Sequence, residues 1–158
     1  MKFRIPMILA PMALAAACAS APPMLNDDMI IPGERIGEIE LGMPLATLMS
    51  LKGTPRSTTP IKGTEATTYT FDGLFVAADE EVYWIVATDP RFRTPNGVSP
   101  GVEQIFARAA YGKPRCVVTK EQVTAYDYRN IYFEVDNVSG KVTQVGILKD
   151  APTCRTAD

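Results

Sequence analysis

The chain contains no histidine. Histidine is the usual general base near neutral pH and the commonest transition-metal ligand, so its absence excludes Ser-His-Asp and Cys-His catalysis. The sequence also lacks a GxGxxG fingerprint, a P-loop and an EF-hand loop. Adjacent carboxylates occur at Asp27-Asp28 and Asp79-Glu80-Glu81, where we expect a linker and a hairpin turn in water. We therefore predict a non-enzymatic protein with no metal and no cofactor.

A basic excess is also missing. Lys2 and Arg4 lie in an N-terminal segment that we expect to be removed. Without them the chain has 14 basic and 18 acidic side chains. Nucleic acid is therefore not an expected partner. The 46% hydrophobic and 22% charged residues are typical of a globular chain that can bury a core.

After residue 17 no stretch reaches the about 18 uninterrupted apolar residues that a membrane helix needs. At the N-terminus, Lys2 and Arg4 precede an apolar run from Ile5 to Ala17, and small residues follow. This order is that of a secretory signal peptide, and the run is too short to span a bilayer comfortably. We predict that residues 1–17 are a signal peptide and that the protein is exported.

Two cleavage sites compete. Residues 15–18, Ala-Ala-Ala-Cys, resemble a bacterial lipobox, although lipoboxes prefer leucine at the first position. In that case Cys18 is acylated, carrying a palmitate-type lipid, and anchors the protein in the outer membrane on its periplasmic side. Ordinary signal peptidase would instead cut after residue 17, 19 or 21 and leave no anchor.

The chain has three cysteines, and exported proteins meet an oxidising compartment. If Cys18 carries lipid, Cys116 and Cys154 remain as a pair. A disulfide between them would close a loop of about 40 residues, worth about 4 kcal/mol in the chain-entropy model. Two separate thiols remain the alternative.

The rest of the chain reads as a tether and two copies of one unit. Residues 18–33 are rich in proline and small residues, as a flexible spacer is. Gly42 and Gly101, Gly53 and Gly112, and Pro55 and Pro114 are each 59 residues apart. We assign a first repeat to residues 34–90, a second to 91–150, and a tail held by the disulfide to 151–158.

Each repeat is predicted to form a helix followed by three antiparallel strands. The expected strands share β-branched and aromatic residues between polar turns: 67–71, 74–78, 82–87, 123–128, 131–136 and 141–148. In the second helix, the apolar spacing predicts a core-facing stripe of Val102, Ile105, Phe106, Ala109 and Ala110. The expected fold class is α+β, with two tandem helix-plus-three-stranded meander repeats and the helices on one face of the sheet.

Alternation along the strands separates two faces of that sheet. One parity is apolar and predicts the core: Tyr69, Phe71, Leu74, Val76, Ile85, Tyr126, Tyr128, Ile131, Phe133, Val135, Val145 and Ile147. The alternate positions place Phe75, Trp84 and Tyr132 on the face without helices, together with Glu134 and Gln144. Aromatics with scattered polar groups are typical of protein-binding surfaces. A register slip of one residue would exchange the faces and bury Trp84.

The pattern Gly37-x-Ile39-x-Leu41-Gly42-Met43, followed after about ten residues by Gly-x-Pro and aromatic strands, resembles bacterial envelope lipoproteins of the SmpA/OmlA (BamE-like) type. Tandem duplication of the unit is similar to the β-lactamase inhibitor protein fold. The resemblance covers roughly residues 36–148. It implies a non-enzymatic protein that binds other proteins, the inhibitor type doing so through aromatics on a concave sheet face.

We therefore expect an envelope lipoprotein that is a protein-binding or outer-membrane assembly module, with Phe75, Trp84, Tyr132 and Gln144 as contact candidates. Its partner would be another envelope protein, its membrane contact the lipid, and no small-molecule substrate is evident. The alternative is a secreted inhibitor that binds an enzyme through the same open face.

Overall fold

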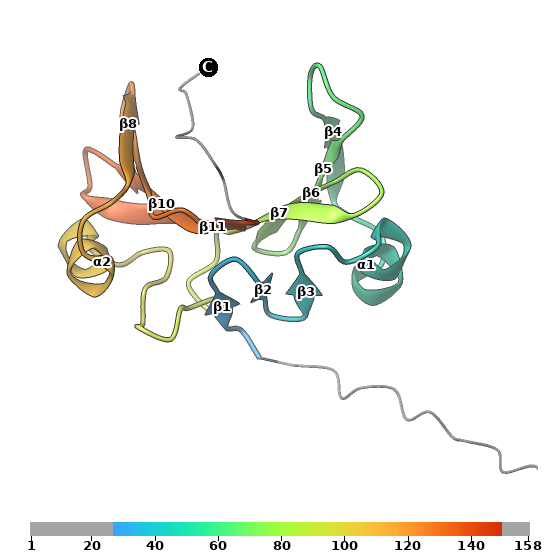
Figure 1. The fold of residues 1–158 in the computed structure, drawn as a ribbon, viewed down its shortest axis with the longest axis horizontal. Coiled ribbons are helices and arrows are strands. Elements are labelled where there is room, and N and C mark those ends of the chain that lie inside the picture. Colours follow the sequence, from blue (N-terminus) through green and yellow to red (C-terminus); the bar gives the residue numbers. More distant parts are fainter. Residues whose placement is uncertain (1–26, 150–158) are drawn as a thin grey trace, which may run out of the picture.

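The computed structural model describes residues 27–149. This part of the chain is mostly β: an eight-stranded antiparallel sheet, a three-stranded sheet and two short helices (Figure 1). The order in the large sheet is β4-β5-β6-β7-β11-β10-β9-β8. Its strands are β4 (Ser57–Pro60), β5 (Thr67–Phe71), β6 (Leu74–Ala78), β7 (Val82–Ala87), β8 (Cys116–Lys120), β9 (Val123–Asp127), β10 (Ile131–Asp136) and β11 (Lys141–Leu148).

Both helices lie on the same side of the large sheet, one beneath each half (Figure 1). They are α1 (Leu45–Lys52) and α2 (Gln104–Tyr111), of eight residues each. Gly53 and Gly112 follow them with φ of 72° and 73°, where a glycine has no Cβ penalty and stops a helix readily. Within residues 27–149 neither helix is long or apolar enough to cross a membrane.

The core lies between the large sheet, the helices and the small sheet. The inward row on the central strands includes Ile85, Ile131, Phe133, Val145 and Ile147, none more than 1% exposed. Every residue that alternation predicted for the core belongs to this cluster or packs against it, so that prediction is confirmed. Burying these side chains supplies the main stabilisation of the fold.

The predicted fold class is wrong. The large sheet and the additional three-stranded sheet make the protein mostly β, and it is not built from two helix-plus-three-stranded meanders. Each half of the large sheet ends in an additional strand, β4 or β8. The residues of β4, Ser-Thr-Thr-Pro, are all exposed. Because β4 is an edge strand, the missing N–H of its proline costs no hydrogen bond between strands. Such a strand has no apolar alternation to predict it.

The predicted inner stripe of the second helix is wrong at Ile105, Phe106 and Ala109, whereas Val102 and Ala110 do pack against the core. Ile105 is 76% exposed and Phe106 is 47% exposed, whereas Ala107 is buried. The sheet instead holds α2 through a hydrogen bond between Gln104 and Tyr126 and through the Tyr111 ring, 4.9 Å from that of Phe133. Aromatic contacts at the ends of the helix therefore set its rotation.

The three-stranded sheet consists of β1 (Ile30–Ile31), β2 (Arg35–Ile36) and β3 (Ile39–Glu40). Ile30, Ile36 and Ile39 are fully buried in the core, so β1 begins inside the segment that composition predicted as a tether. Arg35 is 8% exposed; its guanidinium donates to both carboxylate oxygens of Asp27 at 2.7 and 3.1 Å. It also donates to the Gly37 carbonyl at 2.7 Å, which fixes the turn between β2 and β3.

The Asp27–Arg35 pair predicts acid sensitivity. The hydrogen bonds from Arg35 lower the pKa of Asp27 below its ordinary value. The pair's contribution is therefore complete above about pH 4, where an unfolded aspartate ionises, and is lost as pH falls through the lower folded pKa. We expect Asp27→Asn to reduce the free energy of unfolding at pH 7 but to lose most of that effect near pH 2.

Urea unfolding of the wild type and Asp27→Asn at the two pH values measures this difference. Asp28→Asn is the matched control, because its carboxylate lies 4.0 Å from Arg91 at an exposed position. A gap between wild type and Asp27→Asn that is equally large at pH 2 and pH 7 would contradict the assignment.

Candidate protein-binding face

The large sheet has a second face that none of the described helices or strands covers (Figure 1). One row of directly paired residues crosses it: Thr70, Phe75, Val86, Gly146, Tyr132, Asp127 and Cys116. A neighbouring row pairs Ala77 with Trp84 and Trp84 with Leu148. Paired residues project on the same side of a sheet, so Phe75, Trp84 and Tyr132 share this face, and Gln144, paired with Glu134, joins them.

The face is concave because the two outer ends of the sheet rise on the same side of it. In Figure 1 the hairpin of β4 and β5 stands at one end and that of β8 and β9 at the other. We call the surface formed by these two rows and by the pair Gln144 and Glu134 the open face. Its floor is formed by β6, β7, β11 and β10.

Trp84 and Tyr132 form a pair at the centre of the open face. The indole N–H of Trp84 donates to the Tyr132 hydroxyl at 3.0 Å. Tyr132 is 0% exposed, whereas Trp84 and Phe75 are half-buried. Tyr132 therefore supports Trp84 from below, and Trp84 and Phe75 are the aromatics of this face that keep exposed surface. Gln144 is half-buried as well.

Gly146 is a position of the candidate site that the sequence pattern did not single out. It pairs with Tyr132, and a Cβ at residue 146 would overlap the Tyr132 ring and hydroxyl. Only glycine leaves room at this position for the ring that holds Trp84. An isolated glycine in a strand is a known sign of close approach, so the signal was present in the sequence.

Asp127, on β9, is the next to last residue of the same row, before Cys116 on β8. It is 4% exposed, and its carboxylate lies 3.1 and 3.2 Å from the Arg115 guanidinium and accepts the Arg129 N–H at 2.7 Å. Cys116 pairs with Asp127 in the ladder and is 8% exposed. Cys18 and Cys154 lie outside the described residues, so lipidation and the disulfide stay predictions.

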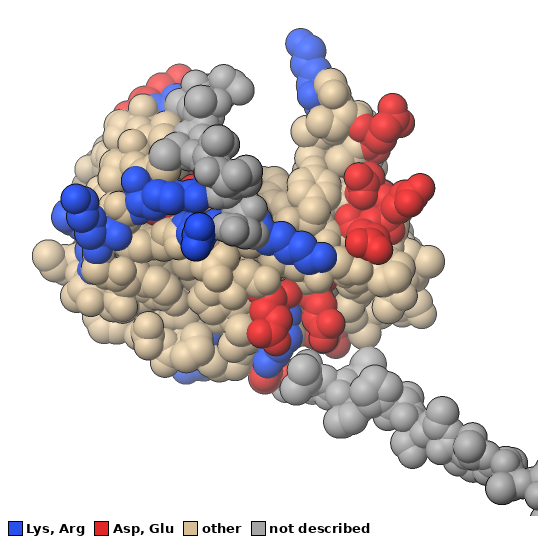
Figure 2. All heavy atoms as spheres, viewed as in Figure 1, with Lys and Arg blue, Asp and Glu red and all other residues tan. Residues whose placement is uncertain are grey.

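Charge divides between the two halves of the molecule. Residues 27–90, which carry β1 to β7, contain four basic and eleven acidic side chains; residues 91–149 contain nine basic and five acidic. In Figure 2 most of the basic surface lies toward α2, and most of the acidic surface lies toward α1 and the small sheet. A partner approaching either half therefore meets a field of definite sign.

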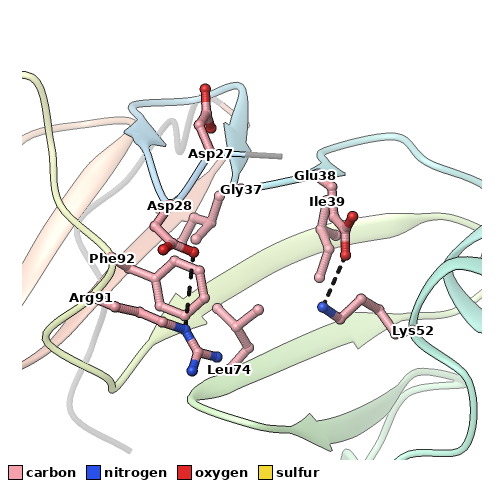
Figure 3. Close-up of a pocket in the computed structure, with 10 residues that line it drawn as sticks. Asp27, Asp28, Gly37, Glu38, Ile39, Lys52, Leu74, Arg91 and Phe92 are labelled. Atoms are coloured by element: carbon pink, nitrogen blue, oxygen red, sulfur yellow. Dashed lines mark hydrogen bonds and ion pairs between the residues drawn. The ribbon is translucent and has the colours of Figure 1, made fainter. Parts of the chain in front are cut away.

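A small pocket of about 170 Å³ lies between the three-stranded sheet and β6 (Figure 3). Its charged side chains are paired with one another: Lys52 with Glu38 at 3.0 Å and Arg91 with Asp28 at 4.0 Å. Asp27 points away from both cations (Figure 3), toward its own partner Arg35. The carboxylates do not converge, and residues 27–149 contain no cluster of three or more acidic or cysteine side chains that could hold a metal. These ion pairs connect the segment of the small sheet to the end of α1 and to the segment that follows β7.

No family model matches the chain, and no curated protein sequence matches it. In fold the chain is similar to the uncharacterized protein YfeY of Escherichia coli, with a TM-score of 0.56, 11% identity, and coverage of 78% of this chain and 99% of that one. At this identity the likeness is one of fold alone.

Two further structures are similar over part of their length. A cysteine-rich secretory protein from Staphylococcus aureus has a TM-score of 0.49 and 19% identity, covering 78% of this chain and 48% of that one. An extracellular protein containing an SCP domain, from Bacillus anthracis, has a TM-score of 0.48 and 7% identity, covering 70% and 44%. The chain thus spans less than half of each of these two proteins.

Proposed function

We propose that this protein is a non-enzymatic lipoprotein of the bacterial cell envelope and that it binds another envelope protein through its open face. The observation that carries the proposal is the pair at the centre of that face. Trp84 is half-buried, and its indole is held by a fully buried tyrosine. A large aromatic fixed in one orientation loses little entropy on binding, which favours it as an energetic anchor.

The surroundings of Trp84 fit the same role. Phe75 adds a second half-buried aromatic, and Gln144, four residues along β11 from the Trp84 partner Leu148, adds polar groups to the same face together with its pair Glu134. The floor is a central part of an antiparallel sheet, so the contact residues are held by ladder hydrogen bonds on both sides. Rigid aromatic contacts with polar neighbours are the composition of protein interfaces.

The location is proposed from the sequence. The signal-peptide pattern of residues 1–17 supports export, and acylation of Cys18 would anchor the chain in the outer membrane on its periplasmic side. We further propose that Cys116 and Cys154 form the remaining disulfide. The burial of Cys116 and its place at the start of an edge strand are consistent with a structural bond.

Crosslinking in intact cells tests the binding role. Wild-type protein should give one specific adduct, and Trp84→Ala should lower its yield about tenfold or more, as loss of an anchor worth about 2 kcal/mol requires. Val138→Ala is the control, because Val138 is 78% exposed in the β10–β11 turn, away from the open face. Equal adduct yields from the two variants would overturn the assignment of Trp84.

Cell fractionation tests the anchor. Cys18→Ser should move the protein from the membrane fraction to the soluble fraction, and intact mass should lose the diacyl or triacyl addition. Cys116→Ser should stay in the membrane fraction, since it leaves the acylated residue in place. Wild-type protein that is cut by ordinary signal peptidase and carries no lipid would contradict the anchor and favour the secreted inhibitor instead.

A further inference from the structure

A second surface, separate from the open face, lies on the outer side of α2. Ile105, Arg108, Ala109, Gly112, Lys113 and Pro114 line a shallow groove of about 450 Å³. Ile105 is 76% exposed there, and Phe106 beside it is 47% exposed. The groove is on the helix side of the sheet, whereas Trp84 belongs to the open face on the other side (Figure 1).

The packing of α2 does not account for these apolar side chains. Ala107, Ala110 and Tyr111 pack on the core side of the helix, and Gln104 is hydrogen-bonded to Tyr126 of the sheet. Ile105 and Ala109 stand four residues apart and project together on the outer side, which places one apolar stripe in solvent. Exposed apolar surface with a polar rim marks an interaction site more often than isolated exposed residues do.

The rim of the groove is cationic. Among residues 27–149, neither Arg108 nor Lys113 forms an ion pair with a carboxylate, and the Arg108 guanidinium lies 5.9 Å from the Tyr126 ring. The groove also belongs to the half of the chain with nine basic and five acidic side chains. Both the local and the wider charge therefore attract an acidic ligand.

Two other occupants fit less well. A second copy would offer its acidic half, but in residues 27–90 the one large apolar side chain with substantial exposure is Tyr83, at 39%. An anionic bilayer would attract α2 but repel the acidic half, and a recessed groove inserts no side chain into lipid. An extended protein segment can satisfy the groove and both cations together.

We propose that the α2 groove docks an acidic segment of a partner protein, with one apolar side chain seated against Ile105 and Ala109 and carboxylates on Arg108 and Lys113. This site acts independently of the open face.

A labelled ten-residue peptide of alternating acidic and leucine residues, titrated against the purified mature protein by fluorescence anisotropy, tests the proposal. Lys113→Glu and Ile105→Ser should each weaken binding about tenfold or more, and added salt should weaken wild-type binding. Lys62→Glu reverses an exposed charge in the β4–β5 turn and should leave binding within about twofold. Trp84→Ala should also leave it unchanged, and circular dichroism checks that each variant is folded.

Four results would overturn the proposal. The peptide fails to bind; Lys113→Glu and Lys62→Glu weaken it equally; Trp84→Ala abolishes binding, which places the peptide on the open face; or phosphatidylglycerol vesicles bind in an Ile105-dependent way while the peptide does not. Only the third outcome involves Trp84. Failure of the groove proposal can therefore be distinguished from failure of the proposal for the open face.

Discussion

Replacing Phe133 by alanine should lower the free energy of unfolding by about 3–5 kcal/mol, the usual cost of removing a buried phenylalanine. Phe133 is 1% exposed on β10. Its ring lies 4.9 Å from Tyr111 on α2 and 5.5 Å from Tyr128, with tilted or edge-on geometries that add stabilisation beyond burial. The substitution removes one of the contacts that hold α2 on the sheet and leaves a cavity.

Urea unfolding followed by circular dichroism measures the loss, with Phe106→Ala as the matched control. Phe106 lies on the same helix, is 47% exposed and should cost less than about 1 kcal/mol. Similar losses for the two variants would mean that the outer face of α2 is packed in solution, and would contradict the rotation of the helix described above.

Gly146→Ala should cost about 2–3 kcal/mol although it adds only a methyl group. The new Cβ would overlap the Tyr132 ring, which is fully buried and cannot move aside without breaking its hydrogen bond with Trp84. Trp84 is the one tryptophan of the chain, so its fluorescence should shift as that bond is lost.

A double-mutant cycle isolates the clash. Tyr132→Ala removes the ring, so Gly146→Ala should add almost no further destabilisation in that background. If the two losses simply add, the ring does not lie across Gly146, and the support of Trp84 by Tyr132 is wrong.

Sequence periodicity was sufficient for the centre of the fold. Six strands, from β5 to β7 and from β9 to β11, are confirmed to within one residue. Their alternation also sorted the core from the open face, because a strand that buries one side must repeat its apolar residues every second position.

Periodicity failed where structure depends on edges and on tertiary contacts. The strand β4 is exposed throughout, and β1, β2 and β3 are two residues long, too short for any repeat to emerge. These additions turn the expected α+β repeats into a mostly β protein. For the second helix the apolar stripe was right for Val102 and Ala110 but wrong for Ile105 and Phe106. Tyr111 and Gln104 meet the sheet in place of those two residues.

The candidate site was partly predictable. Alternation placed Phe75, Trp84, Tyr132 and Gln144 on one face, as the ladder register does. The burial of Tyr132 and the need for Gly146 beneath it depend on how one ring lies across a neighbouring strand. No pattern along a single strand contains that information.

Position-specific photocrosslinking tests the open face most directly. A photoreactive amino acid is placed at Phe75 on the open face or at exposed Ala46 on α1, on the opposite side of the sheet, in the full-length chain in intact cells. We predict a partner adduct from position 75 that disappears with Trp84→Ala, and none from position 46. The absence of an adduct from position 75, or the same adduct from position 46, would contradict the proposal that this face binds the partner.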